Sequence, residues 1–295
     1  MNVARRQLPP PGQLTLDHVS HFVPDLDAAG ALLTQLGFAV TPISAQVTQD
    51  GPAGTSNRCA MLREGYLEFL TPTADTPNAR RMRASMKRYR GVHLACFGTP
   101  AAEEEQARLE SAGFAPQPIV RLERKVEDGM KVRFSVVRAA PGKMPEGRVQ
   151  YVEHLVPEAI WRAAHLRHRN GVLGLAAAYV VAADPARAAA RWARFMGGLP
   201  RREGRLVSLE TDRGKVLIGT RAQIKALLGA APPSPGIAGY ALACKDPKAF
   251  ARLCTQSGLE VNRHLSVLLP PALGGAWRLV RVATKLSAKE MRPPP

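Results

Sequence analysis

The sequence predicts an α+β fold made of four consecutive β-α-β-β-β units. One pattern recurs four times: an apolar strand, an Asp or Pro, an Ala-rich helix that ends near Gly, and then further strands. In addition, Tyr66 to Pro72 reads YLEFLTP and Tyr151 to Pro157 reads YVEHLVP, with Tyr, Glu, Leu and Pro matched in register. Chance is a poor explanation of this match, so an internal duplication is expected.

The first two units are the most similar. In the first, LTLDHVSHFV precedes the helical segment DLDAAGALLTQLGF, and YLEFLTP follows as a strand. In the second, GVHLACFG, AAEEEQARLESAGF and YVEHLVP take the same places. Apolar residues of the first helix recur at helical spacing, and Gly37 and Gly113 stand where the helices end. These units predict a first domain over residues 14–157.

The third and fourth units predict a second domain over residues 172–282. The third contains AAAYVVAADPARAAARWARFMGG with the strands RLVSLETDRG and KVLIGT, and the fourth runs from GYALACKDPKAFARLCTQSGLEV to WRLVRV. Ala177 and Gly239 align with the histidines of the first half, so no metal ligand is expected here.

A basic segment connects the first two units. Six cationic residues lie between Thr73 and Arg90, and a helix with a solvated basic face is expected there: Arg80, Arg81, Arg83, Lys87, Arg88 and Arg90.

Composition narrows the class of protein. The longest uncharged apolar run, residues 172–183, is shorter than the roughly 18 residues of a membrane span, and the N-terminus lacks a secretory layout. A cytoplasmic protein that does not span a membrane is therefore expected. The four cysteines are scattered, which favours free buried thiols over a zinc ribbon or disulfides.

The chain is strongly basic. Lys and Arg number 41 against 24 acidic residues, a net charge of +17 that favours anionic partners. Nucleic acid is disfavoured, because aromatic residues make up only 5% and no helix-turn-helix, zinc-finger or RNP signature is present. A small-molecule substrate, anionic in keeping with this charge, is the expected partner, and the oligomeric state is left open.

Each of the first two units carries one histidine and one glutamate that could bind metal. The four residues are His18, Glu68, His93 and Glu153. If the units pack as pseudo-symmetric mates, the four side chains converge on one divalent ion. Two imidazoles and two carboxylates suit Zn, Ni, Co, Mn or Fe better than Ca or Mg. The competing interpretation is a surface glutamate repeated only because the unit was duplicated.

Four other histidines are possible ligands. His21 and His154 are expected to point to the opposite strand face and are excluded from the ligand set. His165 and His168 could share a helix face, but no third ligand is evident nearby.

The LDHVSHFVPDLDAAGALLTQLGF opening, the four repeated units and the His/Glu pairs resemble the vicinal oxygen chelate (VOC) superfamily, in particular its glyoxalase-like members. The resemblance implies that paired modules form two open-barrel domains, the first holding the metal on His18, Glu68, His93 and Glu153. Asn57 and Arg58, in GTSNRCAML, resemble a segment that lines the substrate cavity in such proteins.

The resemblance also implies a reaction class. A metal-dependent enzyme of the lyase or isomerase type would chelate a small oxygenated substrate and stabilise an enediolate-like intermediate, with Glu153 or Glu68 moving a proton. Two alternatives remain: an Fe(II) extradiol-type dioxygenase, and a metal-free protein that binds or sequesters a ligand. Because one fold serves many chemistries, metal analysis is needed to distinguish them.

Overall fold

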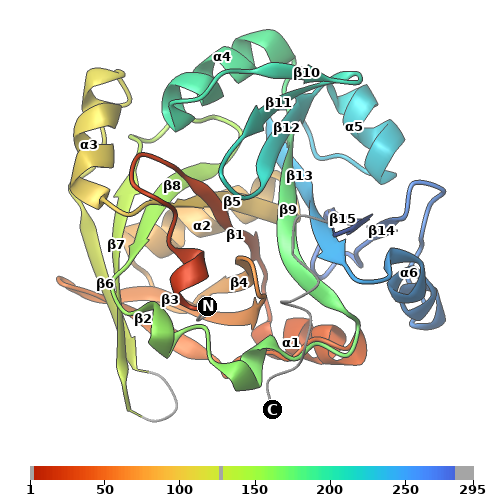
Figure 1. Ribbon diagram of the computed structural model, residues 1–295. Helices are drawn as coiled ribbons and strands as arrows, with labels where there is room; N and C mark the ends of the chain where they lie inside the picture. The colour runs from red at the N-terminus through yellow and green to blue at the C-terminus, as the bar shows by residue number, and fades with distance from the viewer. Residues whose placement is uncertain (1–2, 126–128, 283–295) are drawn as a thin grey trace.

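The computed structural model describes residues 3–125 and 129–282, which form two β-sheets with helices around them (Figure 1). The fold is mixed α+β and repeats β-α-β-β-β-like units, as the sequence predicts. In Figure 1 the first sheet lies on the left, in red to yellow-green, and the second lies on the right, in green to blue.

The first sheet is a closed barrel of eight strands. In chain order the strands are β1 (Thr15–Phe22), β2 (Ser44–Thr48), β3 (Gly51–Met61), β4 (Tyr66–Pro72), β5 (Gly91–Gly98), β6 (Val120–Lys125), β7 (Lys131–Arg138) and β8 (Arg148–His154). Their order around the barrel is β1-β4-β3-β2-β6-β7-β8-β5. The barrel is closed where an open one was expected, because Val47 and Thr48 of β2 pair with Glu123 and Leu122 of β6.

The second sheet is open and has seven strands. They are β9 (Val172–Val181), β10 (Arg201–Glu203), β11 (Leu206–Glu210), β12 (Lys215–Gly219), β13 (Gly236–Cys244), β14 (Ser266–Leu268) and β15 (Ala276–Arg281). The order is β10-β11-β12-β9-β13-β15-β14. The fourth unit therefore contributes three strands, one fewer than the others, within the described part of the chain.

Six α-helices and three short 3-10 helices complete the described structure. The α-helices are α1 (Leu26–Gln35), α2 (Pro77–Arg88), α3 (Ala102–Ser111), α4 (Pro185–Met196), α5 (Arg221–Leu228) and α6 (Pro247–Gln256). The 3-10 helices are η1 (Arg5–Gln7), η2 (Pro157–Ala159) and η3 (Ala163–Leu166). None of these helices is both long and apolar enough to cross a membrane.

The recurring aspartate in the sequence pattern is an N-cap. Asp25, Asp184 and Asp246 each accept hydrogen bonds from backbone N–H groups in the first turn of α1, α4 and α6. Those N–H groups lack partners within the helix, so the carboxylate stabilises the start of each helix. This explains why an Asp stands between strand and helix in three of the four units.

Helix α5 packs on one face of the second sheet. Ile224 and Leu228 of α5 are fully buried against a cluster that includes Ala177 and Leu217. Leu217 pairs with β9 as Glu68 pairs with β1, so α5 fills the face that corresponds to the barrel interior. In the second sheet, apolar side chains of α5 therefore occupy the space that corresponds to the barrel interior.

One large core joins the two sheets. Val19, Leu67 and Phe97 of the barrel belong to the same buried cluster as Val180 and Trp277 of the second sheet. The division into domains at 14–157 and 172–282 stays a prediction. All four cysteines are free and buried, as expected.

Candidate functional site

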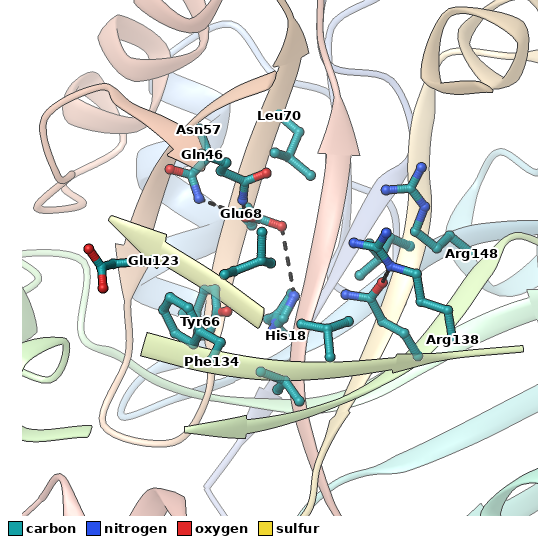
Figure 2. A pocket seen from close by; sticks show the side chains of 15 residues that line it. His18, Gln46, Asn57, Tyr66, Glu68, Leu70, Glu123, Phe134, Arg138 and Arg148 are labelled. Atoms are coloured by element: carbon teal, nitrogen blue, oxygen red, sulfur yellow. Dashed lines mark hydrogen bonds and ion pairs between the residues drawn. The ribbon is translucent and has the colours of Figure 1, made fainter. Parts of the chain in front are cut away.

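A polar pocket lies inside the barrel, between two apolar plugs. One plug contains Met82 of α2 with Phe22 and Leu70, and the other contains Trp161 with Met61. The pocket between them has a volume of about 50 Å³, enough for a few water molecules or one very small ligand. We call it the barrel pocket. Its fifteen lining residues are His18, Gln46, Asn57, Tyr66, Glu68, Leu70, Leu94, Leu122, Glu123, Phe134, Val136, Arg138, Arg148, Gln150 and Val152 (Figure 2).

His18 and Glu68 face each other in this pocket. They lie on the parallel neighbours β1 and β4, where Ser20 pairs with Glu68. His18 Nε2 is 3.7 Å from Glu68 Oε2. Both side chains are buried, and Figure 2 shows Glu68 directed towards His18 and Asn57.

Asp17 holds the His18 ring from behind. His18 Nδ1 lies 2.6 Å from Asp17 Oδ1, and His154 Nε2 lies 3.0 Å from Asp17 Oδ2. Burial opposes ionisation of Asp17, but His154 and His18 more than offset it and lower the pKa of this carboxyl well below its usual range. Burial likewise opposes protonation of His18, while Cys96 and Asp17 raise its pKa well above the ordinary value. The ring therefore carries a proton that it can offer to the pocket.

Glu68 is fixed by donors on three strands, β1, β2 and β3. Ser20 Oγ donates to Oε2 at 2.5 Å, and Asn57 Nδ2 donates to Oε1 at 2.7 Å. Gln46 Nε2 is a more distant donor, 3.5 Å from Oε1. These hydrogen bonds hold the Glu68 carboxylate in one orientation.

Asn57 and Arg58 do not share a role. Side chains alternate along β3, so Asn57 lines the pocket while Arg58 points out of the barrel. Arg58 donates to the carbonyl oxygens of Thr41 and Leu26, and therefore ties β3 to α1.

The second half of the barrel contributes a different chemistry. The inward residues of β8 are Arg148 and Gln150, and β7 adds Arg138, whose Nε donates to Gln150 Oε1 at 3.2 Å. Figure 2 shows the two guanidinium groups together on the side of the pocket away from Glu123. Each guanidinium group makes the binding of another cation in the pocket less favourable.

His93 lies outside the barrel pocket. It precedes the inward Leu94 on β5, so its ring lies on the other face, stacked between Tyr89 and Phe22. Its Nε2 is bonded to the Tyr89 carbonyl oxygen at 2.9 Å. Burial lowers the pKa of His93 to about 4, so the ring is neutral near pH 7.

Glu153 also lies outside. It is half-buried on the outer face of β8, where Oε2 accepts from the Ala102 N–H at the start of α3, 3.4 Å away. Burial raises the pKa of this carboxyl, and the nearby Glu103 acts in the same direction. Its neighbour His154 lies on the inner side and reaches Asp17.

The donor set does not fit the four-ligand metal site. Of His18, Glu68, His93 and Glu153, only the first two line the pocket. Within residues 3–125 and 129–282, no three His, Cys, Asp or Glu side chains are grouped so that they could hold a metal ion. Two buried guanidinium groups beside the pocket oppose a dication further.

The sequence reasoning missed Asp17, Arg138, Arg148 and Gln150. The available signal was strand alternation: Arg148, Gln150 and Val152 recur every second residue, as do Tyr66, Glu68 and Leu70 on β4. His168, considered above together with His165 as a disfavoured second metal pair, has a structural role, because it accepts from the Ala39 N–H and contacts the Met61 carbonyl.

Comparison with known proteins identifies the type of domain. Residues 16–196, more than half of the chain, match the family described as "Glyoxalase-like domain". No curated protein matches the sequence.

Solved structures with the same fold extend over both sheets. A hypothetical protein from Staphylococcus aureus has a TM-score of 0.64 at 12% identity, over 91% of this chain and 99% of that one. A mutant of 4-hydroxymandelate synthase from Streptomyces coelicolor has a TM-score of 0.58 at 17% identity, over 90% and 92%. The Mn(II)-bound glyoxalase from Novosphingobium aromaticivorans has a TM-score of 0.53 at 10% identity, over 90% and 82%. At such identities the likeness shows the VOC-type fold alone.

Proposed function

The chain belongs to the glyoxalase-like domain family, and from that premise we propose that its barrel pocket binds a small oxygenated acid without a resident metal ion. The observation that carries the proposal is the pairing of Arg138 and Arg148 with His18 and Glu68 around one buried pocket. The guanidinium groups would bind the carboxylate of the ligand, and His18 would donate to its neighbouring oxygen.

Charge favours an anion over a metal cation here. Glu68 and Glu123 both line the pocket, but the guanidinium groups of Arg138 and Arg148 lie together on the side away from Glu123, where an anion is favoured over a cation. A bound carboxylate restores the balance and gives both arginines an acceptor that matches their planar donors.

The size of the pocket limits the ligand. A volume of about 50 Å³ admits a fragment of a few non-hydrogen atoms. Pyruvate, lactate and glycolate are therefore suitable probes, because each combines a carboxylate with an adjacent oxygen.

Calorimetric titration with pyruvate tests the proposal. We expect binding to the native protein and a loss of at least about tenfold in Arg148→Gln, the cost of one charge-assisted contact. Arg133→Gln is the matched control, because Arg133 lies on β7 but is exposed on its outer face. Equal affinity in all three proteins, or a stoichiometric divalent metal in the native protein, would contradict the proposal.

A second candidate is proton transfer at a carbon next to a carbonyl group, a reaction of the isomerase type. It is favoured by the 3.7 Å gap between the carboxylate of Glu68 and the imidazole of His18. Glu68 would take the proton from carbon while the C–H electron pair forms a C=C bond, and His18 would protonate the carbonyl oxygen to give an enol. Asp17 would stabilise the imidazolium that precedes the transfer.

Deuterium exchange distinguishes binding from turnover. If the second candidate holds, the methyl protons of pyruvate exchange in D2O in the presence of the native protein and not with Glu68→Gln. If pyruvate binds but the protein does not accelerate exchange of its methyl protons, the result would favour ligand binding without catalysis. An extradiol-type oxygenase finds less support, because it needs two histidines and a carboxylate on one metal face and His18 is the one histidine among the residues that line the pocket.

A further inference from the structure

A second cavity adjoins the barrel pocket and shares Arg138 and Arg148 with it. It has a volume of about 260 Å³ and lies between α2 and the loop that joins β7 to β8. Arg81 and Arg88 of α2 also line it, together with Ser85. We call this cavity the arginine pocket.

Positive charge predominates in the arginine pocket, because Glu68, the carboxylate that acts on Arg138 and Arg148, lines the barrel pocket instead. Four arginines line it, and none of its lining residues is a carboxylate. In the part of the chain that the structure describes, ion pairs engage Arg80 and Arg83 of α2 with Asp75, but none engages Arg81, Arg88, Arg138 or Arg148. The helix thus directs paired arginines to one side and unpaired ones to the pocket.

Arg138 and Arg148 lie deeper in the protein than Arg81 and Arg88, where burial disfavours a positive charge. Arg138 and Arg148 are both half-buried, and the Arg148 guanidinium packs 5.6 Å from the centre of the Phe22 ring. Burial, with Arg138 and Arg81 nearby, lowers the pKa of Arg148 to about 9. Burial and Arg81 also lower the pKa of Arg138. An anion between these groups would relieve their mutual repulsion.

We propose that the arginine pocket binds a phosphate group of the molecule whose carboxylate end occupies the barrel pocket. For the carboxylate end of the ligand, the inference rests on the proposed function. It assigns the ligand to the class of small acids that carry a phosphate group. The smaller barrel pocket would bind the carboxylate end, and the larger arginine pocket would bind the phosphate group.

Phosphate fits this pocket better than a second carboxylate does. A phosphate monoester carries close to two negative charges near pH 7 and offers three oxygens, whereas a carboxylate has one charge and two oxygens. Arginines on α2, β7 and β8 approach the pocket from separate elements, so several can contact one phosphate group. Because Arg138 and Arg148 line both pockets, a phosphate group in the arginine pocket would lie next to a carboxylate in the barrel pocket.

Inorganic phosphate, titrated by calorimetry into the full chain, tests the pocket directly. We expect binding by the native protein and at least about a tenfold loss in Arg81→Gln, an exposed position whose change should not disturb folding. Arg83→Gln is the matched control, because it removes the same charge from the same helix outside the pocket. An affinity that falls equally in both variants, or no binding by the native protein, would overturn the inference.

Two further probes identify the ligand class. Phosphoenolpyruvate should bind at least about tenfold more tightly than pyruvate to the native protein, and this advantage should disappear in Arg81→Gln. His18→Ala should weaken pyruvate binding and leave inorganic phosphate binding unchanged, because His18 lines the barrel pocket and not the arginine pocket, which separates failure of the one from failure of the other. If a single-stranded oligonucleotide bound more tightly than phosphoenolpyruvate and was lost in Arg81→Gln alone, the inference of a small-molecule ligand would be refuted.

Discussion

Gln150 of β8 occupies the position in the second half of the barrel that Glu68 of β4 occupies in the first. Glu68 pairs with Ser20 of β1, Gln150 pairs with Cys96 of β5, and both side chains line the barrel pocket. By the same symmetry Leu94 of β5 is the equivalent of His18 of β1, because Leu94 pairs with Arg148 of β8 as His18 pairs with Tyr66 of β4. The second half therefore carries an amide and an isobutyl group where the first half carries a carboxylate and an imidazole.

Restoring these two positions should create metal affinity. The double variant Leu94→His/Gln150→Glu would supply two imidazoles and two carboxylates to one pocket, a set suited to Zn or Mn. We expect stoichiometric metal in the double variant by elemental analysis and none in the native protein. Stoichiometric metal in the native protein that is lost in His18→Ala would instead restore the metal-dependent function.

The neighbours Asn57 and Arg58 should separate binding from stability. Asn57→Ala removes the donor that orients Glu68, and we expect weaker pyruvate binding. Arg58→Ala removes the hydrogen bonds to the Thr41 and Leu26 carbonyls and should cost about 1–3 kcal/mol of unfolding free energy while binding stays unchanged. Denaturant midpoints and calorimetry on both variants check this. The reverse pattern would contradict the assigned orientation of β3.

Arg108 should stabilise the contact between the two sheets. From α3 its guanidinium donates to the carbonyl oxygens of Arg194 and Phe195 at the end of α4 and to the Tyr151 hydroxyl at 2.6 Å. A cation at a helix C-terminus is favourable, and Arg108→Ala should cost about 2 kcal/mol by chemical denaturation. The matched control Glu105→Gln removes only the ion pair with Arg108 and should cost less than about 1 kcal/mol. Similar losses in both variants would mean that the carbonyl contacts contribute nothing.

His21 should make stability depend on acid pH. It is buried, bonded to the Tyr240 hydroxyl and the Leu273 carbonyl, and packed on Phe69 with His93 nearby. Burial first, and then the charge of His93, lower its pKa from 6.5 to about 4. The contribution of neutral His21 to the free energy of unfolding is therefore full above pH 6.5 and is lost as the pH falls towards 4.

Urea denaturation between pH 7 and pH 4 measures this effect. A single proton taken up on unfolding gives a slope of about 1.4 kcal/mol per pH unit, and His21→Phe should lower the slope by up to that amount. A variant with the native slope would show that His21 does not titrate in this range.

The sequence was sufficient for the fold because the repeated unit is encoded locally. Asp25, Asp184 and Asp246 cap helices at equivalent points, and alternating apolar residues mark the strands between them. Closure of the barrel and the filling of the second sheet by α5 depend on contacts far apart in sequence, so local patterns did not reveal them.

The site was harder to predict, for a reason of parity. YLEFLTP and YVEHLVP match best when Glu68 is aligned with Glu153, but the strand pairings align Glu68 with Gln150. The difference is three residues, and any odd shift moves a side chain to the other face of a strand. For this reason Glu153 lies under α3 and Arg148 lies in the pocket.

The pairing of β2 with β6 has a consequence for exchange with solvent. Among the residues that the structure describes, two pairs, Val47 with Glu123 and Thr48 with Leu122, complete the circle of strands, and Leu122 and Glu123 also line the barrel pocket. The fewest pairings give the lowest free energy of local opening, so the amides of β2 and β6 should exchange with deuterium before those of β1 and β5. This parting of strands would give small molecules a route to the barrel pocket beside Leu122 and Glu123, at a rate set by how often it occurs.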